Sequence, residues 1–186
     1  MALYTRKGDS GTTKTLHCDQ RLSKSSLIAE ALGAVDEINS LLGFCKTQCQ
    51  GESLPVGQGL TFGPVLNQVQ QNLFIIQAEL AGAPGKTITA DKVTALEKII
   101  DAAEKALPPI KSFFVAGGTE LAALLDYART VARRAERRVV RAKEEKLVEV
   151  GEHSLAYLNR LSSLLYALAR LTNYKSGIAE QPPSYE

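Results

Sequence analysis

The 186-residue sequence predicts an all-α protein, a single-domain bundle of five up-and-down helices. Apolar side chains recur at three- and four-residue spacing along most of the chain, as in amphipathic helices. Stretches rich in Pro and Gly interrupt that spacing, and no strand alternation, internal repeat or coiled-coil heptad replaces it. The length supports one buried core, so we expect one domain over residues 1–186.

The first helix is predicted over residues 26–46, "SLIAEALGAVDEINSLLGFCK". Pro55 and four glycines in "GESLPVGQGLTFG" then break the apolar spacing and predict a loop. The spacing resumes over residues 64–80, "PVLNQVQQNLFIIQAEL", where Pro64 suits a first helical turn. These features predict two helices joined by a long connection.

Three more helices follow. Thr89 is a plausible N-cap for residues 90–107, and Pro108 and Pro109 end that helix because neither supplies a backbone N–H. The aromatic segment "SFFVAGG" has no helical period, and Thr119 caps the longest and most basic helix, residues 120–145. The fifth runs from about 154 to 174, and residues 177–186 are expected to form a flexible tail.

Composition excludes several classes of protein. A net charge of +2 is too small to attract nucleic acid or an anionic membrane, and no aromatic platform or binding module accompanies the cations. Cys18, Cys45 and Cys49 form no CxxC, which argues against a disulfide framework or a zinc site. With no signal segment and no apolar run long enough for a bilayer, we expect a cytoplasmic protein.

The N-terminal stretch "YTRKGDSGTTK" has the composition of an anion-binding loop. Glycines expose backbone N–H groups, while hydroxyls and cations complete a shell around an anion. The residues that could do so are Arg6, Lys7, Gly8, Asp9, Gly11, Thr12, Thr13 and Lys14. Arg21 and Lys24 lie just before the first helix, whose N-terminal dipole adds to the attraction. The stretch is not a Walker A motif, and a solvated turn is the alternative.

Polar residues on three helices are the other candidates. Arg129, Arg133 and Glu136 share one stripe at the margin of the core, where surface salt bridges are the alternative. We interpret some of the other arginines of this helix as residues that form such salt bridges, namely Arg134, Arg137, Arg138 and Arg141. Asp36 lies on a helix face of small and polar residues, which either allows another chain or a ligand to approach closely or is simply exposed to solvent. Asn159 either contacts a ligand or forms a structural hydrogen bond. His17 and His153 are isolated in the sequence, and no catalytic triad is visible. The candidate residues instead suit a reaction in which the protein positions the substrates and stabilises a phosphate leaving group.

Four segments in series resemble the PduO-type ATP:cob(I)alamin adenosyltransferases. They are "YTRKGDSGTT", "RLSKSSLIAEALGAVDEINSLLG", "FFVAGGTELAALLDYARTVARRAERRVV" and "LAYLNRLSSLLYALAR". The resemblance implies a ferritin-like five-helix bundle that assembles as a homotrimer, with ATP and corrinoid between subunits. It implies a transferase that moves the 5′-deoxyadenosyl group of ATP to the cobalt of cob(I)alamin and releases triphosphate. A flavin-type reductase and a cobalamin-dependent enzyme are the partners that it suggests.

The resemblance also implies roles for single residues. Thr5, Gly8, Asp9, Gly11 and Thr12 look like the ATP loop within residues 1–23, with Arg21 and Lys24 on the polyphosphate. Arg133 matches the family's arginine that contacts the phosphates, and Glu136 matches the acidic residue near ATP and Mg²⁺. Asn159 matches a further residue that contacts the nucleotide. Arg129 and Asp36 match a salt bridge across the subunit interface. Phe113, with Phe114 as the alternative, matches the aromatic residue that keeps the lower axial ligand off cobalt.

Several positions depart from the family pattern, namely Lys7, Ser10, Ser26, Ala116 and Ser163. Ser163 stands where Asp is common, so the pocket around the fifth helix is the most altered. A catalytically silent carrier or sensor of nucleotide or corrinoid is therefore the alternative to an active enzyme. A purely structural bundle is a third possibility, and it predicts no saturable ATP binding.

Overall fold

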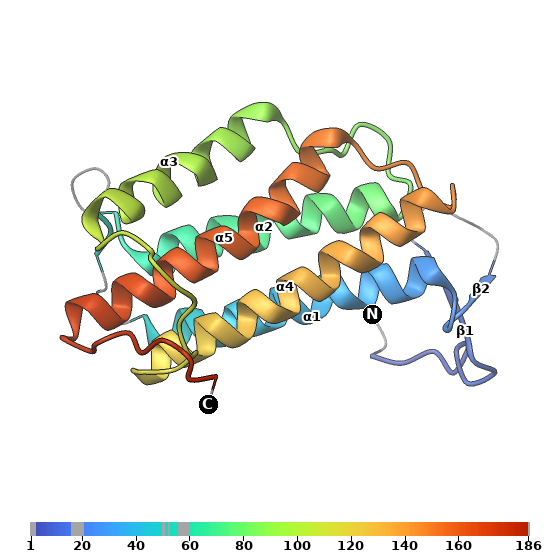
Figure 1. Ribbon diagram of the computed structural model, residues 1–186. Helices are drawn as coiled ribbons and strands as arrows, with labels where there is room; N and C mark the ends of the chain where they lie inside the picture. Colours follow the sequence, from blue (N-terminus) through green and yellow to red (C-terminus); the bar gives the residue numbers. More distant parts are fainter. Residues whose placement is uncertain (1–2, 16–20, 50, 52, 56–59, 186) are drawn as a thin grey trace.

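The structure is a computed structural model that describes residues 3–15, 21–49, 51, 53–55 and 60–185. Its helices are α1 (Leu27–Gln48), α2 (Phe62–Leu80), α3 (Ala90–Ala106), α4 (Glu120–Glu144) and α5 (Glu152–Lys175). A short hairpin of β1 (Thr12–Lys14) and β2 (Arg21–Ser23) precedes them. The prediction of a five-helix, single-domain fold is confirmed (Figure 1).

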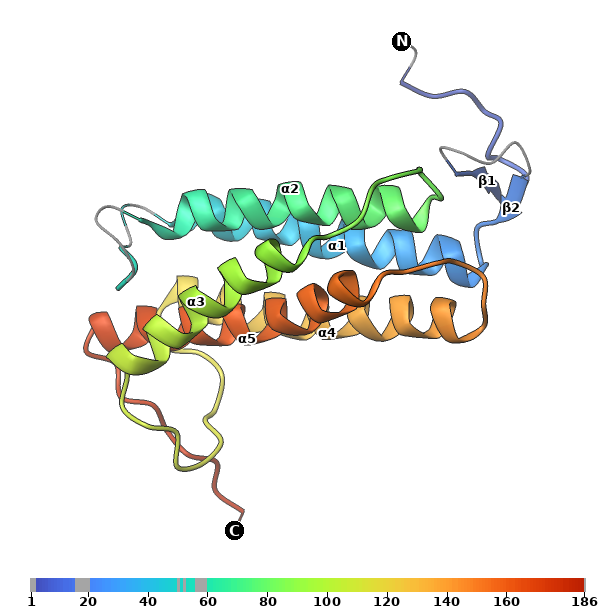
Figure 2. The same cartoon turned by 90° about the horizontal axis from the view of Figure 1, so that it is seen from above.

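Successive helices run in opposite directions, as expected for an up-and-down bundle (Figure 1). Helix α4 packs between α1 and α5, α2 packs on α1, and α3 packs on α5. Seen from above, α1 and α2 lie on one side of the bundle and α4 and α5 on the other (Figure 2). Helix α3 crosses over α5 and diverges from α2, which leaves part of α2 without a helical neighbour on that side.

The core follows the predicted apolar stripes. Along α2, Leu66, Val69, Leu73, Ile76 and Leu80 are all buried. Small side chains line the buried faces of α1 and α4, including Ala31, Ala34, Ala128, Ala132 and Ala135. Small residues let two helix backbones approach closely, so α1 and α4 pack tightly together, with α2 on the outside of α1 and α5 on the outside of α4.

Both predicted capping residues occupy N-cap positions, but Thr119 forms a side-chain capping hydrogen bond and Thr89 does not. Ser26 Oγ accepts a hydrogen bond from the Ala29 N–H at 3.3 Å, and Thr119 Oγ1 accepts one from the Ala122 N–H at 3.1 Å. Helix α3 ends at Ala106, and Leu107 is extended, as the residue before a proline prefers. Helix α2 begins at Phe62, two residues before Pro64, which still places the proline in the first turn.

The hairpin was not predicted from the sequence. Its strands pair antiparallel, with Thr12 opposite Ser23 and Lys14 opposite Arg21. Three residues per strand are too few to produce a recognisable alternation of apolar and polar side chains. Gly11 enters β1 with a φ of +76°, a conformation that glycine adopts without strain.

The C-terminal segment, expected as a loose tail, contacts the loop before α4. The Val115 N–H donates to the Gln181 carbonyl at 2.8 Å, and the Glu180 carboxylate pairs with Arg170 of α5. None of the helices in the described part of the chain is long and apolar enough to cross a membrane. Cys45 is a buried free thiol, and Cys49 Sγ donates to the Cys45 carbonyl at 3.1 Å, while Cys18 and His17 lie outside the described residues.

Candidate functional site

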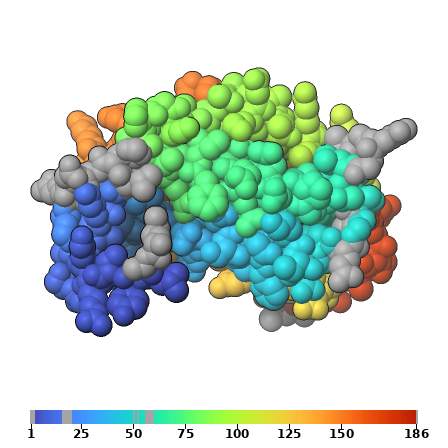
Figure 3. All heavy atoms as spheres, turned by 180° about the vertical axis from the view of Figure 1, so that it is seen from behind, coloured from blue at the N-terminus to red at the C-terminus, as the bar shows by residue number. Residues whose placement is uncertain are grey.

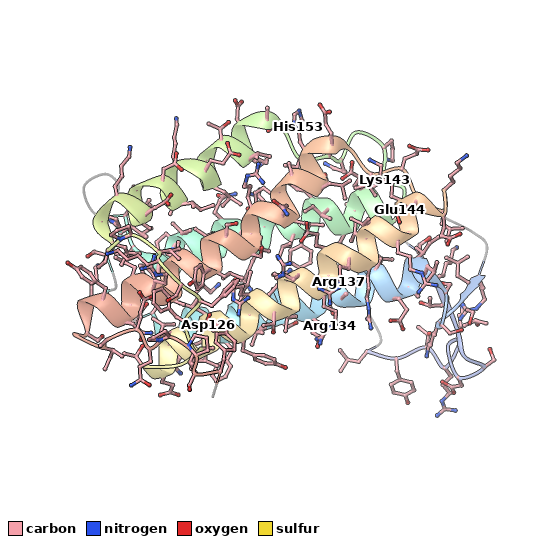
Figure 4. The ribbon with its side chains drawn as sticks, viewed as in Figure 1. Asp126, Arg134, Arg137, Lys143, Glu144 and His153 are labelled. Atoms are coloured by element: carbon pink, nitrogen blue, oxygen red, sulfur yellow. The ribbon has the colours of Figure 1, made fainter. Side chains whose placement is uncertain are left out.

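A pocket of about 280 Å³ on the surface of α4 and α5 is lined by cations. Its walls come from Arg133, Glu136, Arg137, Val140, Arg141, Glu144 and Asn159. We call it the arginine pocket. Figure 4 labels Arg137 and Glu144 on α4, the helix that supplies every lining residue except Asn159. Their three- and four-residue spacing places these side chains on one face of the helix.

The structure thus brings together three residues that the sequence predicted as nucleotide contacts, Arg133, Glu136 and Asn159. Asn159 Nδ2 donates to Glu136 Oε1 at 2.9 Å, which fixes the two side chains relative to each other. Arg160 Nη1 in turn donates to Asn159 Oδ1 at 2.6 Å, and Arg160 Nε donates to Glu97 Oε1 of α3 at 2.9 Å. A chain of polar contacts therefore runs from α3 through α5 to the carboxylate in the arginine pocket.

A larger pocket of about 610 Å³ lies next along the same helices. Its lining consists of Ile110, Lys111, Ser112, Phe113, Phe114, Arg129, Arg133, Ser162, Ser163 and Tyr166. We call it the aromatic pocket. Arg133 belongs to both pockets, so its guanidinium stands at the wall between them.

The two phenylalanines of the aromatic pocket have different surroundings. The Arg170 guanidinium carbon lies 5.4 Å from the centroid of the Phe114 ring, a cation–π contact. Phe113 is 81% exposed, and no ring contact engages it among the described residues. Phe113, the first choice from the sequence, is therefore the ring left available to a bound molecule.

Arg170 fixes the loop that carries these rings. Its side chain is 5% exposed and forms a two-pronged ion pair with Glu180, at 2.6 Å from Nε and 2.8 Å from Nη2. Nη2 also donates to the Pro108 carbonyl at 3.0 Å. The hydrogen bond to Glu180 is the main reason that the pKa of Arg170 is raised. With the Val115–Gln181 bond, these contacts tether the loop on both sides of Phe113.

Arg129 lies at the floor of the aromatic pocket. Its Nε is 3.4 Å from Asp126 Oδ1, a long contact, and its guanidinium carbon is 5.9 Å from the Tyr166 ring centroid. Burial raises the pKa of the Tyr166 phenol, so this ring stays neutral beside the arginine. Arg129 keeps most of its hydrogen-bond donors free for another partner.

The N-terminal loop is organised by Arg21 and Lys24. Arg21 Nε donates to Thr12 Oγ1 at 2.8 Å, and Arg21 Nη2 donates to the Thr12 carbonyl at 2.9 Å and to the Lys7 carbonyl. A Cβ on Gly8 would lie 3.2 Å from Lys24 Nζ, so the glycine lets this ammonium approach the backbone. Most other predicted loop residues, Thr5, Arg6, Asp9 and Gly11 among them, are exposed, whereas Thr12 and Thr13 are half-buried.

Within the described chain, no hydrogen bond or ion pair joins this loop to Arg133, Glu136 or Asn159. The hairpin lies on the α1 side of the bundle, beyond the start of that helix, whereas the arginine pocket lies on the α4–α5 side (Figures 1 and 2). One copy of the chain therefore keeps the two halves of the predicted nucleotide site apart.

Asp36 is likewise separate from Arg129. It is exposed on α1, and its Oδ1 accepts a long, 3.5 Å hydrogen bond from Gln77 Nε2 of α2. Phe44 of α1 and Phe74 of α2 are also exposed, by 50% and 58%. An exposed acid with two exposed aromatic rings on neighbouring helices has the composition of an interface.

A family model described as cobalamin adenosyltransferase matches residues 3–172. The chain belongs to this family. It is 41% identical over 180 residues to the corrinoid adenosyltransferase PduO of Citrobacter freundii, covering 94% of this chain and 50% of that one. It is 39% identical to the corrinoid adenosyltransferase of Bacillus subtilis, covering 97% of this chain and 91% of that one. The chain thus spans about half the length of the first relative and most of the second.

Solved structures of family members share this fold. A phenylalanine-to-histidine variant of the PduO-type ATP:corrinoid adenosyltransferase from Lactobacillus reuteri, complexed with cobalamin and ATP, superposes with a TM-score of 0.86 at 30% identity. The match covers 99% of this chain and 97% of that one. An arginine-to-lysine variant of the enzyme, complexed with ATP, gives a TM-score of 0.85 at 31% identity, covering 98% and 100% of the two chains.

In this member of the cobalamin adenosyltransferase family, two arginines that the sequence did not single out as site residues line a pocket. Arg137 and Arg141, interpreted as surface salt bridges, line the arginine pocket, one and two turns beyond Arg133. The four-residue spacing of Arg133, Arg137 and Arg141 is the sequence feature that could have indicated a shared face. Arg134 and Arg138 do form ion pairs, but with Glu37 and Glu30 of α1 instead of within α4.

The described residues contain no cluster of three or more His, Cys, Asp and Glu side chains that would hold a metal ion by themselves. Mg²⁺ commonly binds through one or two carboxylates together with substrate phosphates, so a full set of protein ligands is not required. Glu136 fits that pattern because Asn159 holds one of its oxygens and because the residue lines a pocket together with three arginines.

Proposed function

We propose that this chain is an ATP:cob(I)alamin adenosyltransferase, which transfers the 5′-deoxyadenosyl group of ATP to cobalt and releases triphosphate. The observation that carries the proposal is the position of Arg133 between the arginine pocket and the aromatic pocket. A polyphosphate bound by Arg133, Arg137 and Arg141 would direct its ribose carbon toward the larger pocket, where a flat corrinoid could lie. The family and the bound ligands of the Lactobacillus reuteri structures support this assignment.

The reaction needs little chemistry from the protein. The cobalt(I) electron pair attacks C5′, the carbon–oxygen bond to the triphosphate breaks, and its electron pair leaves with the triphosphate. Cobalt is oxidised to the alkyl-cobalt(III) state as the bond forms. The chain's own contribution is to align the two substrates and to stabilise the negative charge on the leaving group.

Arg133 and its neighbours supply that stabilisation. Guanidinium groups donate paired hydrogen bonds to phosphate oxygens and keep their charge at any physiological pH. Glu136 would bind a Mg²⁺ ion that travels with ATP and neutralises part of the phosphate charge. Asn159 holds Glu136 in place through a 2.9 Å hydrogen bond, as a positioning residue.

Phe113 is assigned the role of excluding the lower axial ligand of the corrinoid, which gives a four-coordinate cobalt that is easier to reduce. Its exposed ring on a tethered loop suits this role, whereas Phe114 is already engaged by Arg170. The phenylalanine and the arginine replaced in the Lactobacillus reuteri variants are 20 positions apart, as are Phe113 and Arg133.

A homotrimer would complete the site. We assign the N-terminal loop, with Arg21 and Lys24, to the nucleotide that a neighbouring subunit holds in its arginine pocket. Asp36 of one subunit would pair with Arg129 of the next, since each side chain makes only one long polar contact among the described residues of a single chain. Phe44 and Phe74 would be buried at the same contact. A flavin-type reductase would supply cob(I)alamin, and a cobalamin-dependent enzyme would receive the product.

The proposal is tested by mixing the purified protein anaerobically with chemically reduced cob(I)alamin and MgATP and following the visible spectrum. We expect light-sensitive adenosylcobalamin to form far faster than in controls without protein or without ATP. Saturable ATP binding without product would instead favour a carrier or sensor, and Ser163→Asp would be the first variant to assay. Absence of ATP binding would refute both functions.

A further inference from the structure

A third pocket lies between α2 and α3, away from the arginine and aromatic pockets. Its volume is about 550 Å³, within the range of small-molecule sites. Its lining is Leu60, Pro64, Val65, Gln68, Val69, Asn72, Asp91, Lys92, Ala95, Leu96, Ile99 and Tyr157. Helices α2 and α3 are seen from behind in Figure 3, together with α1, whereas α4 and α5 face the viewer in Figure 1. We call it the α2–α3 pocket.

Polar groups gather at one part of this otherwise apolar pocket. Lys92 Nζ donates to Asn72 Oδ1 at 2.8 Å, and Gln68 Nε2 donates to the same oxygen at 3.4 Å. Asn72 Nδ2 lies 3.0 Å from the Tyr157 hydroxyl oxygen. Asn72 is 3% exposed and Tyr157 is fully buried. Buried polar groups normally have all their hydrogen bonds satisfied, so the bonding capacity of this cluster can be counted.

That count leaves donors without acceptors. An ammonium can only donate, so the amide oxygen of Asn72 faces Lys92 and its nitrogen faces Tyr157. The Tyr157 oxygen is then an acceptor, and its proton has no acceptor among the described residues. Lys92 is half-buried and forms no ion pair with the described carboxylates, which leaves two of its three N–H groups unused.

Burial raises the pKa of Tyr157 to about 12, so the phenol keeps its proton and remains a donor throughout the physiological range. Asp91, the one carboxylate in the lining, is exposed, where water screens its charge. The Lys92 ammonium, with two N–H groups left over, therefore lies beside a wall formed by Val65, Val69, Leu96 and Ile99, and the buried Tyr157 hydroxyl holds Asn72 behind it.

We propose that the α2–α3 pocket binds a small monocarboxylate with an apolar body, such as a medium-chain fatty acid. The carboxylate would accept hydrogen bonds from the two remaining N–H groups of the Lys92 ammonium, and the hydrocarbon would lie against the apolar wall. Charge-assisted bonds in a partly buried site discriminate strongly for an anion over a cation of the same length. This inference does not depend on the adenosyltransferase activity.

Octanoate is a suitable probe, with octylamine as the cation of matched length. Calorimetric titration of the full chain should show saturable binding of octanoate with one site per chain. Octylamine should bind at least about tenfold more weakly, the loss expected for one charge-assisted hydrogen bond. Comparable affinity for the two probes, or no saturable octanoate binding, would overturn the proposal.

Variants locate the site. Lys92→Met removes the ammonium while keeping an unbranched side chain, and it should weaken octanoate binding at least about tenfold. Ala95→Trp fills the pocket from an exposed position and should abolish binding. Lys98→Met, an exposed lysine of α3 outside the pocket, should bind like the parent. Unchanged affinity in both Lys92→Met and Ala95→Trp, with native circular dichroism, would place any octanoate site elsewhere and refute the assignment.

Discussion

At the scale of single residues, Arg133 owes its position to helix geometry. It follows Arg129 by one turn and precedes Arg137 by another, so these three guanidinium groups share one face of α4. Arg129 lines the aromatic pocket, Arg137 lines the arginine pocket, and Arg133 lines both. Its neighbour Arg134 points to a different face and pairs with Glu37 of α1 at 2.6 Å. Arg133 and Arg134 are therefore adjacent in the sequence but have different surroundings.

Replacing Arg133 tests its assigned role. Arg133→Ala should reduce kcat/KM at least about thirtyfold, because the loss of a transition-state contact to the triphosphate removes at least about 2 kcal/mol of stabilisation. Arg134→Ala is the matched control, since its surface ion pair contributes little to stability and nothing to the pockets. Initial rates of adenosylcobalamin formation give both values. A near-normal kcat/KM for Arg133→Ala would remove Arg133 from the reaction.

Phe113 and Phe114 form a second matched pair. Phe113→Ala should lower the rate of the reaction and leave the thermal midpoint nearly unchanged, because the ring is exposed. Phe114→Ala should lower the midpoint, since it removes the cation–π contact with Arg170, worth about 0.5–1 kcal/mol. Kinetics and thermal unfolding of both variants separate the roles. If Phe114→Ala alone impaired the reaction, the sequence assignment would shift to Phe114.

At the scale of elements, a single carboxylate joins the loops at one end of the bundle. Glu79, near the end of α2, accepts hydrogen bonds from Thr87 Oγ1 at 2.7 Å, from the Gly151 N–H at 2.9 Å, and from the Ser154 hydroxyl. These partners belong to the loop before α3 and to the start of α5. A Cβ on Gly151 would lie 3.0 Å from Thr87 Oγ1, so a glycine allows this close approach.

Removing that junction should destabilise the fold without affecting the pockets directly. Glu79→Ala leaves three donors unpaired, and we expect a loss of about 2 kcal/mol in the free energy of unfolding. For a chain of this size the thermal midpoint should fall by about 4–8 °C. Glu149→Ala, an exposed acid beside the same loops, should shift it by less than about 2 °C. Equal midpoints for the two variants would show that the junction does not stabilise the bundle.

Helix positions could be predicted from the sequence because their signals are local. Apolar spacing placed α2 and α4, and Thr89, Thr119 and Pro108 marked helix ends that the structure confirms. The hairpin was missed because its pairing depends on Arg21 reaching back to Thr12 and Lys7, a contact with no local pattern. The sequence did not indicate that Arg137 and Arg141 line a pocket, because a cationic stripe looks the same whether it faces water or a pocket. Only the packing of α5, which brings Asn159 to Glu136, distinguishes the two.

At the scale of the whole molecule, the proposed reaction site is incomplete in one chain. The N-terminal loop and Asp36 lie on α1 and its approach, whereas Arg129, Arg133 and Asn159 lie on α4 and α5. No sequence pattern indicates which surface of one copy meets which surface of another. We therefore propose that each reaction site is formed by residues of two neighbouring subunits.

Mixing two inactive variants tests that claim most directly. Asp36→Ala and Arg129→Ala should each be nearly inactive alone, because each breaks every interface pair. Co-refolded or co-expressed in equal amounts, they should regain a sizeable fraction of the parent rate of adenosylcobalamin formation, since some interfaces combine an intact Asp36 with an intact Arg129. A mixture no more active than the separate variants, with mixed oligomers verified by mass spectrometry, would contradict a site shared between subunits.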